Sequence, residues 1–231
     1  RLPDFKDVSL FEEGLYAQEL PVCIAALEGL RRIGSPEAAR ILISALDKAG
    51  EQDRPALLSA LKTFSGKDAL AEIAGKLAAP SPVVREAAVL TLTEQRARSY
   101  SKAMLPLTGD TEPKVARAAF SALAVMAGEN ELSDLISSAL GATDKQFRKS
   151  VSETIFSAAQ RLENRRKMAS QLLSATKDTD VDRRIWALSM LPAAGGAAAL
   201  EASTAFSASS DSNVRETAVR ALAAWPDAGA L

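Results

Sequence analysis

The sequence predicts an all-α protein, built as a right-handed α-solenoid of about seven helix pairs. The first observation is composition: 47% of the residues are apolar but only 5% are aromatic, and the alanine-rich remainder favours helix. The second is that apolar residues recur at helical spacing in stretches bounded by Pro or Gly. The third is that one such stretch returns along the whole chain every 31 to 34 residues, as in repeat architectures.

The clearest copy of this stretch begins at Asp211 and ends at Pro226. Asp211 can cap the free amides of a first helical turn, and Pro226 stops the helix. Between them Val214, Ala218 and Leu222 fall on one small apolar face, which suits close packing against another helix. We take Val214 as the anchor of this repeat. The equivalent anchors are Val22, Asp53, Val84, Val115, Phe147 and Val181.

Two further positions in each repeat support the alignment. The fourth residue after the anchor is apolar in all seven copies, and the eighth is apolar in six, the exception being Ser189. We therefore expect one repeat domain over residues 1–231, which we also expect to be a fragment of a longer protein. Its second helices are predicted near residues 21–33, 53–65, 82–97, 113–127, 145–161, 180–191 and 212–225.

Each repeat has room for a first helix before the next anchor. In residues 35–46, Ser35 suits the N-cap, Pro36 the first helical position and Glu37 the first turn. Residues 66–77 and 131–140 show the same arrangement. No segment alternates with period two for long enough to predict a strand.

The anchor motif, Asp211 followed by Val214, Arg215, Ala218 and Leu222, resembles the second helix of a HEAT repeat. Residues 81–88 resemble the same helix, and residues 35–38 resemble the first helix of the short subtype found in phycobilin-lyase-like proteins. Ala116 and Asp182 depart from the pattern, which usually has arginine there. The resemblance implies a HEAT-like solenoid and says little about function, because such proteins include scaffolds, lyases and DNA glycosylases. The tetratricopeptide repeat is the alternative by period, but its aromatic signature does not recur.

Several functions have little support in the composition. A net charge of −1 provides no general attraction to nucleic acid or anionic membrane. The sequence has no histidine and one cysteine, Cys23, which we expect to be a small buried apolar side chain. We therefore expect no catalytic, metal-binding or cofactor-binding residues, and no membrane span. The chain begins with Arg1, so we expect a processed or trimmed N-terminus, which leaves a cytoplasmic or an exported protein possible.

The candidate binding surface is the concave face that the second helices would line. Positions two, six and nine after each anchor point away from the apolar face and carry mixed charges, which suits a protein or peptide ligand better than a polyanion. An ordinary solvated surface is the alternative. The candidate protein-binding residues are Glu86, Arg117, Lys149, Glu153, Arg183, Glu216 and Arg220.

Other residues have both a functional and a structural interpretation. The arginines beside the anchors, such as Arg85 and Arg148, could grip phosphates, but we expect them to bond acidic residues or helix ends. A basic cluster at residues 161–167 could contact nucleic acid or an acidic partner, and we expect a solvated turn instead. Trp186 could hold a base in a glycosylase-like site, but its column predicts inter-repeat core.

The sequence thus predicts a non-enzymatic scaffold that binds a protein or peptide on its concave face. The alternatives are a nucleic-acid-binding HEAT-like solenoid and a degenerate HEAT-like enzyme. The cluster at 161–167 favours the first alternative, and Trp186 is the feature that favours the second.

Overall fold

The computed structural model describes residues 8–17 and 19–225. These residues form fourteen α-helices and three short 3-10 helices, with no strand among them. The chain divides into two compact units between Ala122 and Leu123. None of the described helices is both long and apolar enough to span a membrane.

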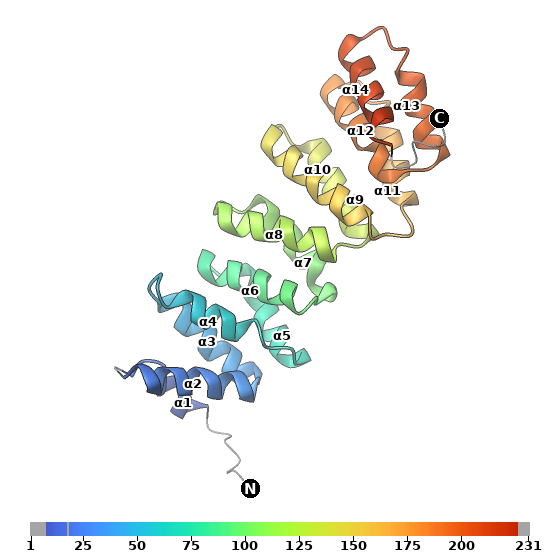
Figure 1. The fold of residues 1–231 in the computed structure, drawn as a ribbon. Coiled ribbons are helices and arrows are strands. Elements are labelled where there is room, and N and C mark those ends of the chain that lie inside the picture. Colours follow the sequence, from blue (N-terminus) through green and yellow to red (C-terminus); the bar gives the residue numbers. More distant parts are fainter. Residues whose placement is uncertain (1–7, 18, 226–231) are drawn as a thin grey trace. The chain divides into compact units, whose positions relative to one another are not determined.

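The first unit contains the helices of the first four repeats (Figure 1). Its second helices lie side by side, and its first helices form the layer behind them. The elements are α1 (Ser9–Gly14), α2 (Leu20–Ile33), α3 (Pro36–Lys48), α4 (Arg54–Leu61), α5 (Lys67–Ala74), η1 (Gly75–Ala78), α6 (Pro82–Glu94), η2 (Arg98–Tyr100), α7 (Ser101–Met104), η3 (Leu105–Gly109) and α8 (Pro113–Met126), which ends just beyond the division.

The second unit continues the same alternation of first and second helices. Within it α10, α12 and α14 pack in sequence, as do α9, α11 and α13. The elements are α9 (Glu129–Gly141), α10 (Lys145–Ala159), α11 (Arg166–Ala175), α12 (Val181–Ala194), α13 (Ala197–Phe206) and α14 (Ser212–Ala223). Each of the seven predicted second helices therefore coincides with an observed α-helix.

Local sequence explains where these helices begin and break. The Ser35 hydroxyl accepts a hydrogen bond from Ala38 N at 3.1 Å and caps α3, as its sequence predicts. Gly34 takes φ +61° where α2 ends, a left-handed conformation that glycine adopts without strain. The first helix of the fourth repeat is split into η2, α7 and η3, and Pro106 within η3 lacks the amide that a continuous α-helix would need.

The core follows the predicted columns in most repeats. Leu30, Leu61, Leu92, Leu123 and Ile155, each eight residues after its anchor, are fully buried. Leu222 was expected to be equally buried, but it is only half-buried. The second helix of the last repeat, α14, therefore packs mainly through its smaller apolar residues, among which Val214, Ala218 and Ala221 are buried.

The predicted register of the sixth repeat is wrong by two residues. Asp180 caps α12 by accepting hydrogen bonds from the amides of Asp182 and Arg183, just as Asp211 caps α14 three residues before Val214. Arg183 therefore stands at the anchor, and Val181 is exposed. With this register the eighth position is Leu191, which is fully buried, and the apparent polar core residue Ser189 is only half-buried.

Candidate protein-binding grooves

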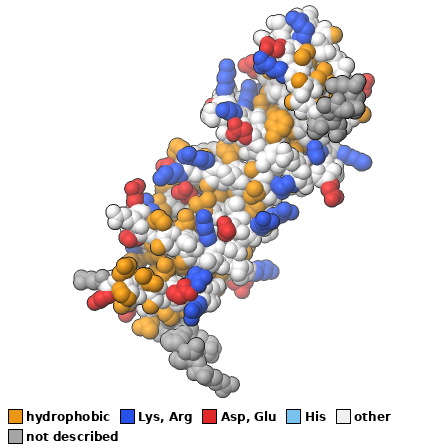
Figure 2. Space-filling view, in the orientation of Figure 1, with side chains coloured by type: hydrophobic (Ala, Val, Ile, Leu, Met, Phe, Trp, Pro, Cys, Tyr) orange, Lys and Arg blue, Asp and Glu red, His pale blue; other side chains and the backbone are white. Residues whose placement is uncertain are grey.

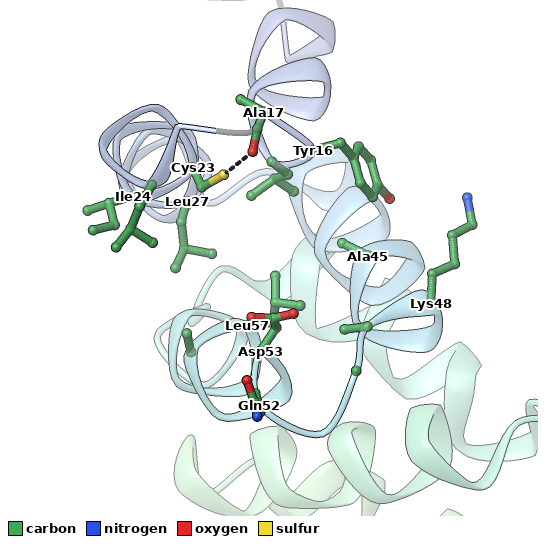
Figure 3. Close-up of a pocket in the computed structure, with 15 residues that line it drawn as sticks. Tyr16, Ala17, Cys23, Ile24, Leu27, Ala45, Lys48, Gln52, Asp53 and Leu57 are labelled. Atoms are coloured by element: carbon green, nitrogen blue, oxygen red, sulfur yellow. Dashed lines mark hydrogen bonds between the residues drawn. The ribbon is translucent and has the colours of Figure 1, made fainter.

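The first unit has an open groove between α2 and α4, which we call groove A. Its volume is about 530 Å³, and the C-terminal end of α3 forms part of its lining. Leu27 of α2 and Leu57 of α4 point toward one another from its two sides (Figure 3). Tyr16 and Lys48 lie together at one end of the groove.

The sequence of α2 explains why groove A is apolar. Residues 20–27 of α2 are all apolar, so this half of the helix shows an apolar side in every direction. Its inner side is buried, but Leu20 is 70% exposed and Ile24 is 57% exposed. Together with Tyr16, which is 54% exposed, they form part of the hydrophobic surface over α1 and α2 (Figure 2). Exposed apolar clusters of this kind commonly mark interaction sites.

Polar groups are few in groove A. Lys48 at the end of α3 and Asp53 just before α4 bring one charge of each sign. Cys23 is half-buried, and its thiol donates a hydrogen bond to Ala17 O at 3.0 Å (Figure 3). Cys23 was expected to be a buried core residue, and the structure places it instead on the wall of an open groove.

A second groove lies on the other side of α4, between α4 and α6, and we call it groove B. Its volume is about 440 Å³. Leu46, Leu58 and Val83 provide apolar surface, while Arg54 and Glu86 are two of its charged lining residues. Glu86 is thus the one predicted binding residue that lines either groove.

The other predicted binding residues lie outside these grooves. Arg117 of α8 is exposed. In the second unit Lys149 and Glu153 form an ion pair at 3.9 Å, and Arg220 pairs with Glu216 at 2.5 Å, in each case four residues apart on one helix. Such exposed pairs are common on solvated helix faces and contribute little to stability.

Arg183 has a 41% exposed side chain, but its place in the repeat differs from the one predicted for it. In the corrected register it stands at the anchor of α12, and its guanidinium lies 3.7 Å from the Asp178 carboxylate and 3.8 Å from the Asp180 carboxylate. The amides of Arg183 and Asp182 donate to Asp180, and these bonds hold the pKa of that carboxyl below its usual value. Arg183 thus contributes to the start of its own helix.

The arginine that directly follows an anchor mostly bonds to the preceding helix end. Arg85 donates to Ala79 O and Pro80 O, both at 2.8 Å. Arg148 donates to the carbonyls of Ala139 and Ala142, and Arg215 donates to Ser209 O. These bonds satisfy carbonyls left free where a first helix ends, so the structural interpretation of these arginines is confirmed.

Arg54 differs from these equivalents. Like the Nε of Arg184, which follows the corrected anchor Arg183, the Nε of Arg54 is buried and has no hydrogen-bond partner among the described residues. The side chain lies in groove B, where Lys114 brings a second positive charge and Glu51 and Glu86 bring two negative ones. No ion pair shorter than 4.0 Å joins Arg54 to either carboxylate within the described part of the chain.

Trp186 and the basic cluster at residues 161–167, which favoured an enzyme or a nucleic-acid-binding function, make contacts within the chain itself. Trp186 is buried, and its indole nitrogen donates to the Ser152 hydroxyl at 2.9 Å. In the basic cluster, Arg165 donates to Ala193 O and Arg161 donates to Ala124 O. Among residues 8–17 and 19–225, no group of three His, Cys, Asp or Glu side chains is placed to hold a metal ion.

No family model and no curated protein matches this sequence. Solved structures do match its fold. A chain of the complex in which Kap95p binds RanGDP aligns with 95% of this chain and 35% of its own length, at 18% identity and a TM-score of 0.56.

The chain is an α-solenoid of HEAT/armadillo-like repeats. Other solved structures that align with it include the complex of CpcE and CpcF of phycocyanin lyase from Nostoc, at 19% identity, 93% and 86% coverage and a TM-score of 0.42. Human deoxyhypusine hydroxylase aligns at 18% identity, 94% and 95% coverage and a TM-score of 0.39.

The repeat periodicity of the sequence does not predict groove A. A signal was present, because residues 20–27 form an uninterrupted apolar run that one buried helix face cannot account for. The rest of the groove comes from the α1–α2 connection, the end of α3 and the start of α4. Only stacking of the first two repeats brings these segments together.

Proposed function

We propose that this solenoid is a non-enzymatic scaffold that binds a polypeptide segment of a partner protein, and that groove A is its principal binding site. The observation that carries the proposal is the combination of an open apolar groove with exposed Leu20, Ile24 and Tyr16 on its border. Burying these side chains against a partner would remove apolar surface from water at about 25 cal/mol per Å². The Kap95p complex supports the proposal, since it is a protein–protein complex that contains this fold.

The charge pattern favours a polypeptide over a polyanion. Groove A has one basic and one acidic side chain, and groove B has two of each. Such balanced grooves provide no net positive field for phosphates, but they suit a ligand with apolar side chains and backbone polar groups. Among the described residues of both grooves, no group of three His, Cys, Asp or Glu side chains is placed to hold a metal ion.

The test begins with a library of random peptides displayed on phage and selected against the whole chain. Affinities of selected peptides are then measured by fluorescence anisotropy with wild type, Ile24→Asp and Val219→Asp. Val219 is the matched control, because it is an apolar side chain 52% exposed on α14, far along the chain from groove A. We expect Ile24→Asp to weaken binding at least tenfold and Val219→Asp to leave it unchanged.

Cys23 provides an independent readout of occupancy. It is the single cysteine of the sequence and lines groove A, so a bound peptide should slow its alkylation by iodoacetamide. Selected peptides that bind Ile24→Asp as tightly as wild type, and that leave Cys23 alkylation unchanged, would place the binding site elsewhere and reject groove A.

A further inference from the structure

Grooves A and B share one wall, the first two turns of α4. Gln52, Asp53, Ala56 and Leu57 line groove A, whereas Glu51, Arg54, Pro55 and Leu58 line groove B. Helix α4 is packed between α2 and α6 on these two sides. A ligand that fills both grooves must therefore cross α4.

The side chains are short where a ligand would cross α4. Pro55, Ala56 and Ser59 are exposed on this part of α4, and none of them has a long side chain. A polypeptide backbone can therefore approach α4 closely between the two grooves. Lys48 and Lys114 line grooves A and B from other helices, and Arg54 is the long charged side chain of α4 itself.

The spacing expected between grooves on either side of one helix favours one conformation of the ligand. Packed helices lie roughly 8–10 Å apart, so successive grooves between them repeat at about that distance. In a polyproline II segment, side chains three residues apart point the same way and are separated by about 9.3 Å. In a β-strand, side chains on one face repeat every ~6.7 Å, which does not match one groove spacing.

Arg54 adds a requirement for a hydrogen-bond acceptor. Its buried Nε has no partner among the described residues, a feature that it shares with Arg184 of α12, whereas Arg85, Arg148 and Arg215 bond to backbone carbonyls. A polyproline II segment has no internal hydrogen bonds, so its carbonyls are free to accept. An α-helix with apolar residues seven apart would also span about 10.5 Å, but its interior carbonyls are already bonded within the helix.

Tyr16 provides the aromatic surface that proline-rich ligands use. It is more than half exposed beside groove A, and polyproline II segments commonly dock on aromatic side chains. Proline also lowers the entropy lost on binding, because the segment is already extended before it docks.

We propose that the partner segment is a proline-containing polyproline II stretch that crosses α4 with apolar side chains at positions i and i+3, one in groove A and one in groove B. A backbone carbonyl between these two side chains accepts a hydrogen bond from the Arg54 guanidinium. This inference rests on the proposed function, because it specifies the ligand of the same site. It adds groove B and Arg54 to the binding surface.

The experiment uses the phage-selected peptides whose binding depends on Ile24. Alanine scanning of each peptide should find two apolar anchors three residues apart, with proline tolerated between them. Arg54→Met should weaken binding at least tenfold, whereas Arg98→Met, at an exposed arginine of the same unit outside both grooves, should not. Circular dichroism and the urea midpoint of Arg54→Met establish that the variant is folded.

A second measurement isolates the carbonyl. Replacing the peptide bond between the two anchors by an alkene removes the acceptor, and this change should weaken binding to wild type but not to Arg54→Met. Peptides that depend on Ile24 but are indifferent to Arg54→Met, or that carry anchors seven residues apart and lose binding on proline insertion, would overturn this inference and leave the proposed function standing. Peptides that are indifferent to Ile24→Asp would instead reject the proposed function.

Discussion

Arginine at the position after the anchor serves two purposes in this chain. Arg85, Arg148 and Arg215 each bond carbonyls at the end of a preceding first helix, so their role is to join the two helices of a repeat. Arg54 occupies the same position in its repeat but lies beside groove B with its Nε unpaired among the described residues. The same residue type at the same repeat position therefore bonds carbonyls in three repeats, whereas the Nε of Arg54, and that of Arg184 after the corrected anchor of α12, is buried without a partner among the described residues.

Leu92 is expected to be one of the residues on which the first unit depends. It is fully buried at the eighth position after its anchor, so Leu92→Ala should lower the free energy of unfolding by about 2–5 kcal/mol. Leu222→Ala, at the equivalent but half-buried position of α14, should cost less. Urea midpoints compare the two, and equal shifts would contradict the assigned burial.

The pair of Arg85 and Asp110 makes stability depend on pH. Their side chains are 14% and 6% exposed and form two hydrogen bonds of 2.7 and 2.8 Å. The hydrogen bond from Arg85 lowers the pKa of Asp110 from its usual 3.8. A carboxyl with a lowered pKa stabilises the fold above its unfolded pKa, and this stabilisation is lost as the pH falls through the folded pKa.

We therefore expect Asp110→Asn to lower the free energy of unfolding by about 1.5–3 kcal/mol at pH 7. The difference from wild type should shrink as the pH falls from 3.8 through the lowered pKa of folded Asp110, because below that folded pKa the carboxyl is protonated in both folded and unfolded chains. Denaturant unfolding at a series of pH values checks this. Asp47→Asn, an exposed carboxyl on α3, is the control, and a pH-independent gap between wild type and Asp110→Asn would contradict the assignment.

At the scale of the element, capping aspartates define register better than the first apolar residue does. Asp144, Asp180 and Asp211 each accept hydrogen bonds from amides of the helix that follows. Counting three residues from the cap gives Phe147, Arg183 and Val214, and the burial of α12 agrees with that count. Because the anchor residue Arg183 is polar, the apolar pattern alone placed the anchor two residues too early, at Val181.

The corrected register of α12 predicts unequal effects for two neighbouring substitutions. Leu191→Ala should destabilise the chain by about 2–5 kcal/mol, because Leu191 is fully buried. Ser189→Ala should change stability by less than about 1 kcal/mol, since its hydroxyl only bonds Trp186 O within the same helix. Thermal or urea unfolding measures both, and a larger loss with Ser189→Ala would restore the original register.

At the scale of the whole molecule, helices contact mainly their neighbours along the chain, and the net charge is close to zero. Its net charge is −1, and residues 143–184 carry only four more basic than acidic side chains. Within that segment Arg161, Arg165 and Arg183 are engaged by carbonyls or carboxylates of the chain itself. Few cationic side chains of this segment therefore remain available to attract a polyanion.

We accordingly expect no tight binding to duplex DNA at physiological salt. Fluorescence anisotropy with a labelled duplex measures this, at several salt concentrations. A dissociation constant below 1 μM, rising steeply with salt and abolished by Arg166→Glu with Lys177→Glu, would contradict the expectation. Both side chains are exposed, so these substitutions should not disturb folding.

The sequence alone determined the helical class, the repeat and the positions of the second helices, because these depend on local patterns of apolar and capping residues. The burial of Leu30, Leu61 and Leu92 follows from the same periodicity. Charged residues were harder to assign. Lys149 with Glu153, and Arg220 with Glu216, matched a binding column by position, but each pair is satisfied on its own helix.

Only the tertiary structure decided where the grooves lie. Groove A joins Tyr16, Ile24, Lys48 and Leu57, which belong to different segments and are brought together by stacking of the first two repeats. Periodicity shows which face of one helix is apolar, but it does not show how closely a neighbouring helix covers that face. That coverage depends on the fit of side chains between helices, and it determines whether an apolar residue becomes core or remains available to a partner.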